Sequence, residues 1–429
     1  MKREDLSKAK ILVCSANSWN SKVGDNTFPL LLEGLPVENI SNLFIREETP
    51  DSSVCDNYFR ISEGKVMKSI FKPSIKTGEK VEKEADDNSQ LQIEQKELYS
   101  KKARFYYLKL FIRELIWFIG KWKTKELDDF IEKASPDIVV YEMSRYIHLN
   151  NIIRYIIKKS GAKGVGCFWD DTFTYKQENS LGYKALRFFQ RKNLKRLAKA
   201  SDEFFAITPK TKREADEFFN INCSVLTKAI TEFSEYEEPK EKEALKMLYT
   251  GNLTIGRDET MLLVADALKE LNKNGTKITL DIYTNTDLSE KYKNGLNTKF
   301  SKLYDAIPQN EVIKKQREAD ILLFVESLKD DNKIARLSFS TKITDYYAAG
   351  KCIFAVGNKD LAPVELFIEE DSAVVVTSAD ELQEKISQLV NMETLKKYSA
   401  KAYETGKKSY SAEVVKEKFF TVLNGILEK

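Results

Sequence analysis

The stretch SFSTKITDYYAAGKCIFAV, residues 338–356, contains a helix start, a helix and a buried strand in close succession. Ser340 or Thr341 can cap the helix, because short hydroxyl side chains are favoured at that position. The apolar run 352–356 has the length and composition of a strand buried on both faces. A helix followed at once by such a strand is one repeat of the alternation that builds parallel sheets.

The same alternation extends through most of the 429 residues. The apolar runs predict strands at 10–16, 41–45, 138–141, 165–169, 203–207, 245–249, 278–283, 321–325, 352–356 and 373–376. The periodic segments predict helices at 27–35, 105–133, 149–159, 182–200, 258–271, 310–318 and 341–349. Residues 58–62 and 66–71, around Glu63-Gly64, are typical of a hairpin. The polar segment 73–102 predicts a mobile loop or a solvated helix start.

One segment divides the chain. Residues 232–243, EFSEYEEPKEKE, are rich in glutamate and poor in apolar residues, which predicts a linker. An N-terminal domain over 1–231 and a C-terminal domain over 244–405 follow, and a helix in 406–429 can pack back on the N-terminal domain. We expect two Rossmann-like α/β domains that face a cleft, because ligands of open α/β sheets bind at the carboxyl ends of the strands.

Composition excludes several classes of function. Lys and Arg total 69 against 66 Asp and Glu, a net charge of +3, which argues against a nucleic-acid partner. The five cysteines form no CxxC pair and indicate a reducing compartment. His148 is the single histidine, which excludes a multi-histidine zinc site, and we interpret it as structural. No leader or membrane span is visible in the sequence, so a cytoplasmic protein is expected.

The helix after Ser340 carries an unusual charge. Lys342 lies in its first turn, although cations are favoured at the other end of a helix. An anionic ligand would resolve this conflict, since a helix N-terminus offers free N–H groups to a phosphate. Asp345 lies on the same face and can accept hydrogen bonds from ribose hydroxyls. The alternative is an ordinary capped helix with a salt bridge between Lys342 and Asp345.

A second candidate is YTGNLTIGRDE, residues 249–259, where a strand ends and a helix begins. Gly251 allows a ligand to approach the backbone closely. Arg257, at the start of the helix, is placed for a bidentate phosphate contact. The alternative is a plain strand–helix turn with a surface arginine.

Together, residues 248–268, 319–327 and 340–356 resemble the C-terminal half of family-4 glycosyltransferases, which have the GT-B fold. The resemblance covers about 245–375. It implies a retaining transfer from a nucleotide-sugar, UDP- or GDP-linked, to a glycan or lipid-linked acceptor. No DxD-type metal motif stands out in the sequence, so we expect no cofactor and no metal. The resemblance places Arg257 and Lys342 on the diphosphate and Asp345 on the ribose, as the catalytic residues. The donor site then comprises Gly251, Asn252, Arg257, Ser340, Thr341, Lys342 and Asp345.

Some positions depart from the family pattern. Leu337 stands where the first acid of an E-x7-E pair is usual, and Asn252 replaces an arginine. Thr227-Lys228-Ala229 replaces an Asn-Gly, and Trp169-Asp170-Asp171 occupies the region of an N-domain histidine. Two alternatives therefore stay open: a catalytically silent GT-B subunit that binds a partner transferase or a glycosylated substrate, and a nucleotide-sugar epimerase.

In the N-terminal half, polar residues follow predicted strands. Gly24 and Asp25 lie in the loop after the first strand, and Asp170 and Asp171 follow a later one. We expect these four to border the acceptor in the cleft, with a simple surface loop and a capping turn as the alternatives.

Two helices have the composition of membrane-surface elements. Residues 184–199 contain seven cations and no acid, which suits an anionic leaflet. Residues 105–122 add tryptophan and tyrosine, which favour membrane interfaces. The alternatives are a solvated basic helix and a core-packed helix.

Overall fold

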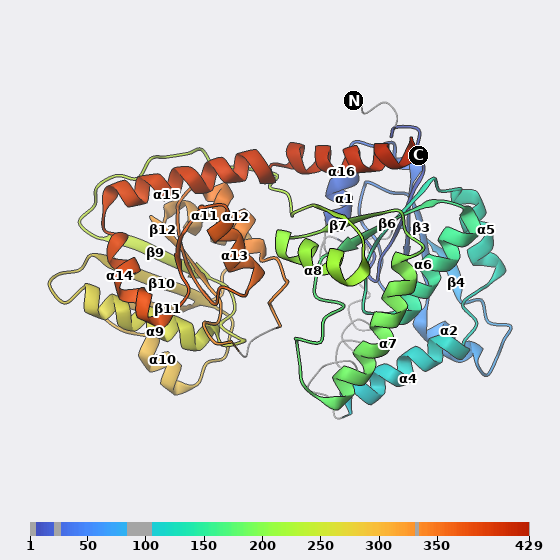
Figure 1. Cartoon of the computed structure of the whole chain (residues 1–429), viewed down its shortest axis with the longest axis horizontal. Helices are drawn as coiled ribbons and strands as arrows, with labels where there is room; N and C mark the ends of the chain where they lie inside the picture. The colour runs from blue at the N-terminus through green and yellow to red at the C-terminus, as the bar shows by residue number, and fades with distance from the viewer. Residues whose placement is uncertain (1–5, 21–26, 84–104, 331–333, 429) are drawn as a thin grey trace. The chain divides into compact units, whose positions relative to one another are not determined.

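The computed structural model describes residues 6–20, 27–83, 105–330 and 334–428, and it divides into two compact units (Figure 1). The first unit consists of Met1–Ile207, Thr211–Leu226 and Lys416–Lys429. The second unit consists of Thr208–Lys210 and Thr227–Val415. Each unit has its own α/β core, so both are α/β structures built on a parallel sheet, as the sequence predicts.

The first unit holds an eight-stranded sheet in the order β4-β3-β2-β1-β5-β6-β7-β8 among the described residues. Every neighbouring pair is parallel except β3 and β4. The central strands are buried and apolar, as expected for a sheet covered on both faces. The strands are β1 (Ile11–Cys14), β2 (Ile40–Phe44), β3 (Asn57–Ile61), β4 (Gly78–Val81), β5 (Ile138–Glu142), β6 (Lys163–Phe168), β7 (Glu203–Ala206) and β8 (Cys223–Val225).

Helices connect these strands, and a last helix joins them from the end of the chain. In that last helix Phe419 lies against Phe205 of β7, with ring centroids 5.5 Å apart. The helices are α1 (Thr27–Leu32), α2 (Glu63–Ser69), α4 (Tyr106–Ile119), α5 (Lys125–Ala134), α6 (Ile147–Ser160), α7 (Leu181–Ala198), α8 (Pro209–Phe219) and α16 (Ala412–Leu427).

The hairpin predicted around Glu63-Gly64 is wrong. β3 is followed by helix α2, because Ser62 caps that helix by accepting a hydrogen bond from the Lys65 N–H at 3.2 Å. The partner of β3 is β4, which pairs with it antiparallel and lies inside the segment predicted as a mobile loop, 73–102. The remainder of that prediction, from residue 84 on, falls outside the described residues.

The second unit holds a six-stranded sheet, all parallel, in the order β11-β10-β9-β12-β13-β14. Its strands are β9 (Leu245–Thr250), β10 (Ile278–Thr284), β11 (Ser301–Asp305), β12 (Ile321–Val325), β13 (Cys352–Val356) and β14 (Val374–Val376). Its helices are α9 (Arg257–Leu271), α10 (Glu290–Leu296), α11 (Gln309–Glu318), α12 (Thr341–Ala349), α13 (Ala362–Glu369), α14 (Leu382–Gln388) and α15 (Met392–Thr405).

Two separate apolar cores cover the two faces of this second sheet. Met247 and Tyr249 of β9 belong to one core, and Leu248, between them, belongs to the other. The alternation follows from the two-residue period of a strand. β9 is thus fixed in the middle of the unit, and the loop after Thr250 leaves the sheet at its carboxyl edge.

The glutamate-rich segment 232–243 forms no helix or strand and lies along the second unit. The Ser234 N–H donates to the Ala348 carbonyl at 3.0 Å, and the Tyr403 hydroxyl donates to the Ser234 carbonyl at 3.0 Å. Phe233 and Tyr236 both contact the Tyr403 ring. Backbone contacts and aromatic packing therefore hold this segment against one unit.

One cation of the basic helix α7 is buried inside the first unit. Arg187 is 2% exposed, and it donates to the Thr172 carbonyl, to Gln177 Oε1 at 3.0 Å and to the Tyr183 hydroxyl at 3.3 Å. Its guanidinium therefore joins α7 to the loop after β6. Burying a cation is tolerated only when its donors are satisfied in this way.

We expect Arg187→Met to lower the free energy of unfolding by about 2–4 kcal/mol, because it leaves buried acceptors without a donor. Urea unfolding followed by circular dichroism measures the change. Lys192→Met, at an exposed position of the same helix, is the matched control and should change stability little. Equal stability of the two variants would contradict the structural role of Arg187.

Candidate donor site of the second unit

The site begins where β9 ends, at Gly251. Gly251 has a φ of 140°, a backbone conformation that disfavours every residue with a side chain. A Cβ at this position would lie 2.6 Å from Cε and 2.7 Å from Nζ of Lys342. The φ favours glycine here, and a side chain at this position would also displace the end of the Lys342 side chain, which passes directly over Gly251.

Lys342 reaches Gly251 from the first turn of α12. Ser340, one of the two residues predicted as a cap, is the N-cap residue, but its side chain makes no capping hydrogen bond within the described structure. The first turn carries no acidic residue. The positive end of this helix and the Lys342 ammonium therefore lie together at the carboxyl edge of the sheet. Thr341 is exposed beside them.

Arg257, the first residue of α9, is held by two neighbours. Its Nε and Nη2 donate to the carboxylate of Glu326 at 3.0 and 2.7 Å, and its Nη1 donates to Asn252 Oδ1 at 2.6 Å. These contacts engage three of the five N–H groups of a guanidinium. Glu326 directly follows β12, so the ion pair joins the start of α9 to the end of β12, the strand next to β9.

Burial and like charge change the acidity of the site. Desolvation, together with the nearby charge of Arg257, lowers the pKa of Lys342 to about 8, against its ordinary value of 10.5. Desolvation raises the pKa of Asp345, while the cations Lys228 and Lys342 oppose that shift. No ion pair joins Lys342 to Asp345 among the described residues. The alternative of a simple salt bridge on the helix surface therefore has no support.

The structure brings together the predicted donor residues Gly251, Asn252, Arg257 and Lys342, and it adds others that were not predicted from the sequence. Glu326 orients Arg257, and the Tyr249 ring lies 5.3 Å from the Lys342 ammonium. Lys228 acts electrostatically on Asp345. The sequence does contain a signal for Glu326. This residue directly follows a buried apolar run, and residues that contact ligands gather at the carboxyl ends of such strands.

The acceptor candidates lie in the first unit. Gly24 and Asp25 fall outside the described residues. Asp171 is fully buried, and its carboxylate accepts hydrogen bonds from the N–H and the hydroxyl of Thr174, which is the geometry of a capping turn. Asp170 is more exposed, and its Oδ2 lies 3.5 Å from Arg145 Nη2. Of the described candidates, Asp170 is thus the better placed to contact a ligand.

Among the described residues, no group of three or more His, Cys, Asp or Glu side chains is placed to hold a metal ion. None of the described helices has the length and apolar character to span a membrane.

No protein-family model matches the chain, and no curated protein matches its sequence. Solved structures do match it over nearly its whole length. The lipopolysaccharide outer core galactosyltransferase WaaB, in its apo form, is 13% identical, with 97% of this chain and 99% of that chain covered and a TM-score of 0.58. Anabaena Alr3699/HepE in complex with UDP is 9% identical, covers 97% and 100%, and has a TM-score of 0.58.

A trehalose-6-phosphate protein from E. coli, bound with UDP-2-fluoro glucose, is 14% identical, with 96% and 99% covered and a TM-score of 0.57. These structural neighbours are GT-B glycosyltransferases. The chain therefore has the GT-B fold, as the resemblance implied. The narrower assignment to family 4 stays a prediction.

The depressed pKa of Lys342 predicts a stability cost. Between its folded pKa of about 8 and the unfolded value of 10.5, the unfolded chain binds more protons than the folded one. The folded state is therefore penalised below pH 8, and the penalty disappears as the pH rises toward 10.5.

We expect Lys342→Met to be more stable than the wild type at pH 7, by about 1–3 kcal/mol, with the difference shrinking above pH 8. Urea unfolding at pH 7, 8.5 and 10 tests this. Lys302→Met, at an exposed position of β11, is the control and should show no such pH trend. A variant less stable than the wild type at pH 7 would contradict the buried charge.

Proposed function

We propose that the protein is a glycosyltransferase that moves a sugar from a nucleotide-sugar to a glycan or lipid-linked acceptor, with retention of configuration. One observation carries this proposal. Three cations, Arg257, Lys342 and Lys228, surround two carboxylates at the carboxyl edge of a parallel sheet, beside the N-terminus of α12. The excess positive charge is partly desolvated, which is the environment that binds a diphosphate strongly.

The structural neighbours support the choice of donor. One of them is in complex with UDP and another is bound with UDP-2-fluoro glucose. UDP-sugars are therefore the first donors to test, and GDP-sugars the second. Asp345 would hold the ribose hydroxyls, since it lies one helical turn from Lys342 on the same helix.

In the proposed reaction the bond between the anomeric carbon and the diphosphate breaks, and the acceptor oxygen bonds to that carbon on the same face. The proton of the acceptor hydroxyl passes to the leaving phosphate oxygen. Lys342, Arg257 and the N–H groups at the start of α12 stabilise the charge that develops on the diphosphate. Glu326 holds the guanidinium in place before the substrate arrives, so no reorganisation is required during the reaction.

A silent GT-B subunit is the second candidate, and one observation favours it. The family pattern has an acidic residue at position 337, but this chain has Leu337, whose side chain is fully buried. The carboxylate expected at that position is therefore missing. Slow release of nucleotide from the donor alone distinguishes the two functions, because a silent subunit cannot cleave the donor. An epimerase would instead convert the donor sugar without any acceptor.

We also propose contact with an anionic membrane surface through 184–199. Lys184, Lys192, Arg196 and Lys199 are exposed on α7, and Phe188 beside them is 56% exposed. Two other cations of this segment contact the interior of the unit instead of solvent. Arg187 is buried, and Arg191 packs on the Phe218 ring at 3.9 Å. The membrane-facing charge is therefore smaller than the sequence indicates.

Replacing either phosphate-binding cation should weaken nucleotide binding. We expect Lys342→Ala and Arg257→Ala each to lower the affinity for UDP or GDP about ten- to a hundredfold, since each removes a charge-assisted contact. Isothermal titration calorimetry measures the affinity of each variant for the nucleotide. Arg317→Ala, a surface arginine of the same unit, is the control. Unchanged affinity in both site variants would remove the site assignment.

Transfer should proceed without a divalent ion, because fixed protein charges neutralise the leaving diphosphate. We expect activity to survive EDTA and the product to keep the anomeric configuration of the donor, which NMR of the product reports. Loss of activity in EDTA with recovery on Mg²⁺ or Mn²⁺ would overturn this mechanism. An inverted product would overturn the retaining assignment.

A further inference from the structure

Helix α4 of the first unit presents apolar side chains outward and charged side chains inward. Leu108, Ile112, Leu115 and Phe118 are 55%, 48%, 54% and 83% exposed, whereas Arg113 is only 9% exposed. A surface helix of a globular protein normally shows the reverse arrangement. An apolar face of this size marks a surface that binds something apolar.

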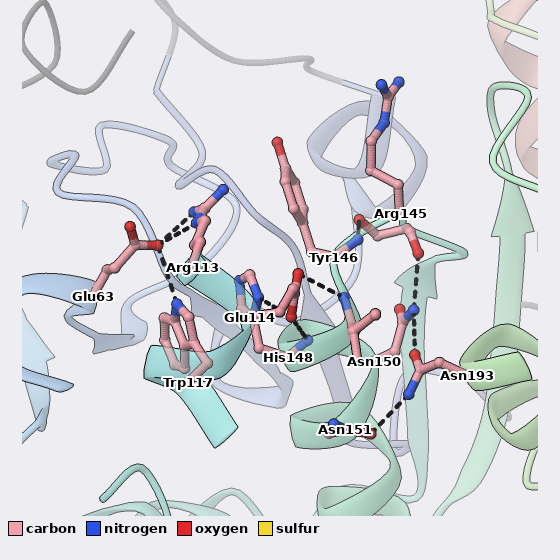
Figure 2. Close-up of polar contacts among 12 residues, drawn as sticks. Glu63, Arg113, Glu114, Trp117, Arg145, Tyr146, His148, Asn150, Asn151 and Asn193 are labelled. Atoms are coloured by element: carbon pink, nitrogen blue, oxygen red, sulfur yellow. Dashed lines mark hydrogen bonds and ion pairs between the residues drawn. The ribbon is translucent and has the colours of Figure 1, made fainter. Parts of the chain in front are cut away.

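Inner contacts fix this orientation of α4 (Figure 2). The Glu63 carboxylate accepts from Arg113 Nε at 2.6 Å and from Trp117 Nε1 at 3.1 Å. Glu114 accepts from the backbone N–H groups of Ile147 and His148 at 3.2 and 3.0 Å, and so caps α6 from outside. Because α6 depends on this cap, α4 cannot rotate to bury its apolar face without losing these bonds.

Glu114 also orients the histidine. Its Oε2 lies 3.0 Å from His148 Nδ1, and the Trp117 ring stacks on the imidazole with centroids 4.5 Å apart (Figure 2). The His148 Nε2 is buried without a hydrogen-bond partner in the described structure. The surface beneath the apolar face is thus a rigid layer built from α4 and α6.

The apolar face of α4 forms one wall of an open groove of about 1450 Å³, with α6 and α7 as the others. Pockets for small molecules usually measure 300–1,000 Å³. A larger, open groove suits a long chain better than a compact molecule. Its apolar lining consists of Leu108, Phe111, Ile112, Leu115, Trp117, Phe118, Trp122, Ile147, Leu186 and Phe189.

Cations line the same groove along α6 and after α4. They are Arg154, Lys158 and Lys159 of α6, with Lys121 and Lys123. Lys159 is paired with Asp128 at 3.1 Å, but no carboxylate pairs with Arg154 or Lys158 among the described residues. The Arg154 Nε is buried without a hydrogen-bond partner in the same part of the chain. Glu114 is the one acid among the described lining residues, and its oxygens are already engaged.

An apolar groove that also contains two cations without a carboxylate partner in the described part of the chain, Arg154 and Lys158, is complementary to an amphiphile with an anionic head. We propose that this groove binds one molecule of a phosphate-headed lipid, with its hydrocarbon chain along α4 and its phosphate at Arg154 and Lys158. This inference rests on the proposed function, of which the lipid would be the acceptor. The exposed cations of α7 would keep the unit near the membrane that supplies the lipid.

The test uses the full chain and a fluorescent single-chain alkyl phosphate kept below its micelle concentration, followed by anisotropy. We expect saturable binding, weakened at least tenfold in Leu115→Glu and in Arg154→Gln. The corresponding alkyl alcohol should bind more weakly than the phosphate and respond to Leu115→Glu but not to Arg154→Gln. Inorganic phosphate alone should not compete at equal concentration, because it lacks the chain.

Matched controls lie in the same unit. Phe71→Glu changes an aromatic residue that is 87% exposed outside the groove, and Lys133→Gln removes an exposed cation elsewhere. Both should leave binding unchanged, and all variants should melt within a few degrees of the wild type. An equal loss in the controls, or no loss in Leu115→Glu, would overturn the proposal.

Two other occupants would give distinct results. If anionic vesicles bind the protein in a Leu115-dependent way but the soluble alkyl phosphate does not, α4 inserts into the bilayer and the groove proposal is wrong. A dimer that Leu115→Glu converts to a monomer, without binding of the probe, would assign the face to a second copy. UDP and GDP titrations of the same variants separate the two proposals. Probe binding without nucleotide binding would contradict the transferase function and still support the lipid-binding groove.

Discussion

The ion pair between Arg257 and Glu326 is the interaction on which the strand ends of the second unit depend. It joins the start of α9 to the end of β12, next to β9 in the sheet. Glu326 is 3% exposed, and a carboxylate at that depth requires a partner with good geometry. Once the pair is formed, the guanidinium is fixed beside Lys342, and the negative charge of Glu326 offsets part of the repulsion between the two cations. The cationic character of the edge therefore follows from one buried contact.

Most of the fold could be predicted because central parallel strands are apolar on both faces. β1, β12 and β13 appear as uninterrupted apolar runs, and β5 does so up to its last residue. The edge strands β4, β8 and β11 were missed, since their exposed residues are polar and give no such run. Helix α2 was taken for a strand because the capping bond from Ser62, rather than the composition of the segment, decides its conformation.

The site was partly predictable for a similar reason. Arg257 and Lys342 each lie at the start of a helix, where physical chemistry alone favours an anion. Their partners could not be found from local sequence, because Glu326 lies 69 residues from Arg257 and meets it only through the sheet. The outward orientation of the apolar face of α4 could not be predicted either, because the contact of Glu114 with α6 that fixes it spans 33 residues. Long-range contacts of single polar side chains leave no periodic signal.

The close approach of Lys342 to Gly251 has a consequence for how these two positions can change. The end of the lysine side chain occupies the volume that a Cβ at 251 would need, so exchanging the glycine for a residue with a side chain would displace the ammonium from its place over the backbone. The positive φ of Gly251 would still disfavour that exchange. The two positions are therefore coupled in one direction: a change at residue 342 leaves the backbone at 251 undisturbed, whereas a side chain at 251 would move the end of Lys342. In evolutionary terms, loss of the glycine would alter the position of the ammonium even where the lysine itself is retained.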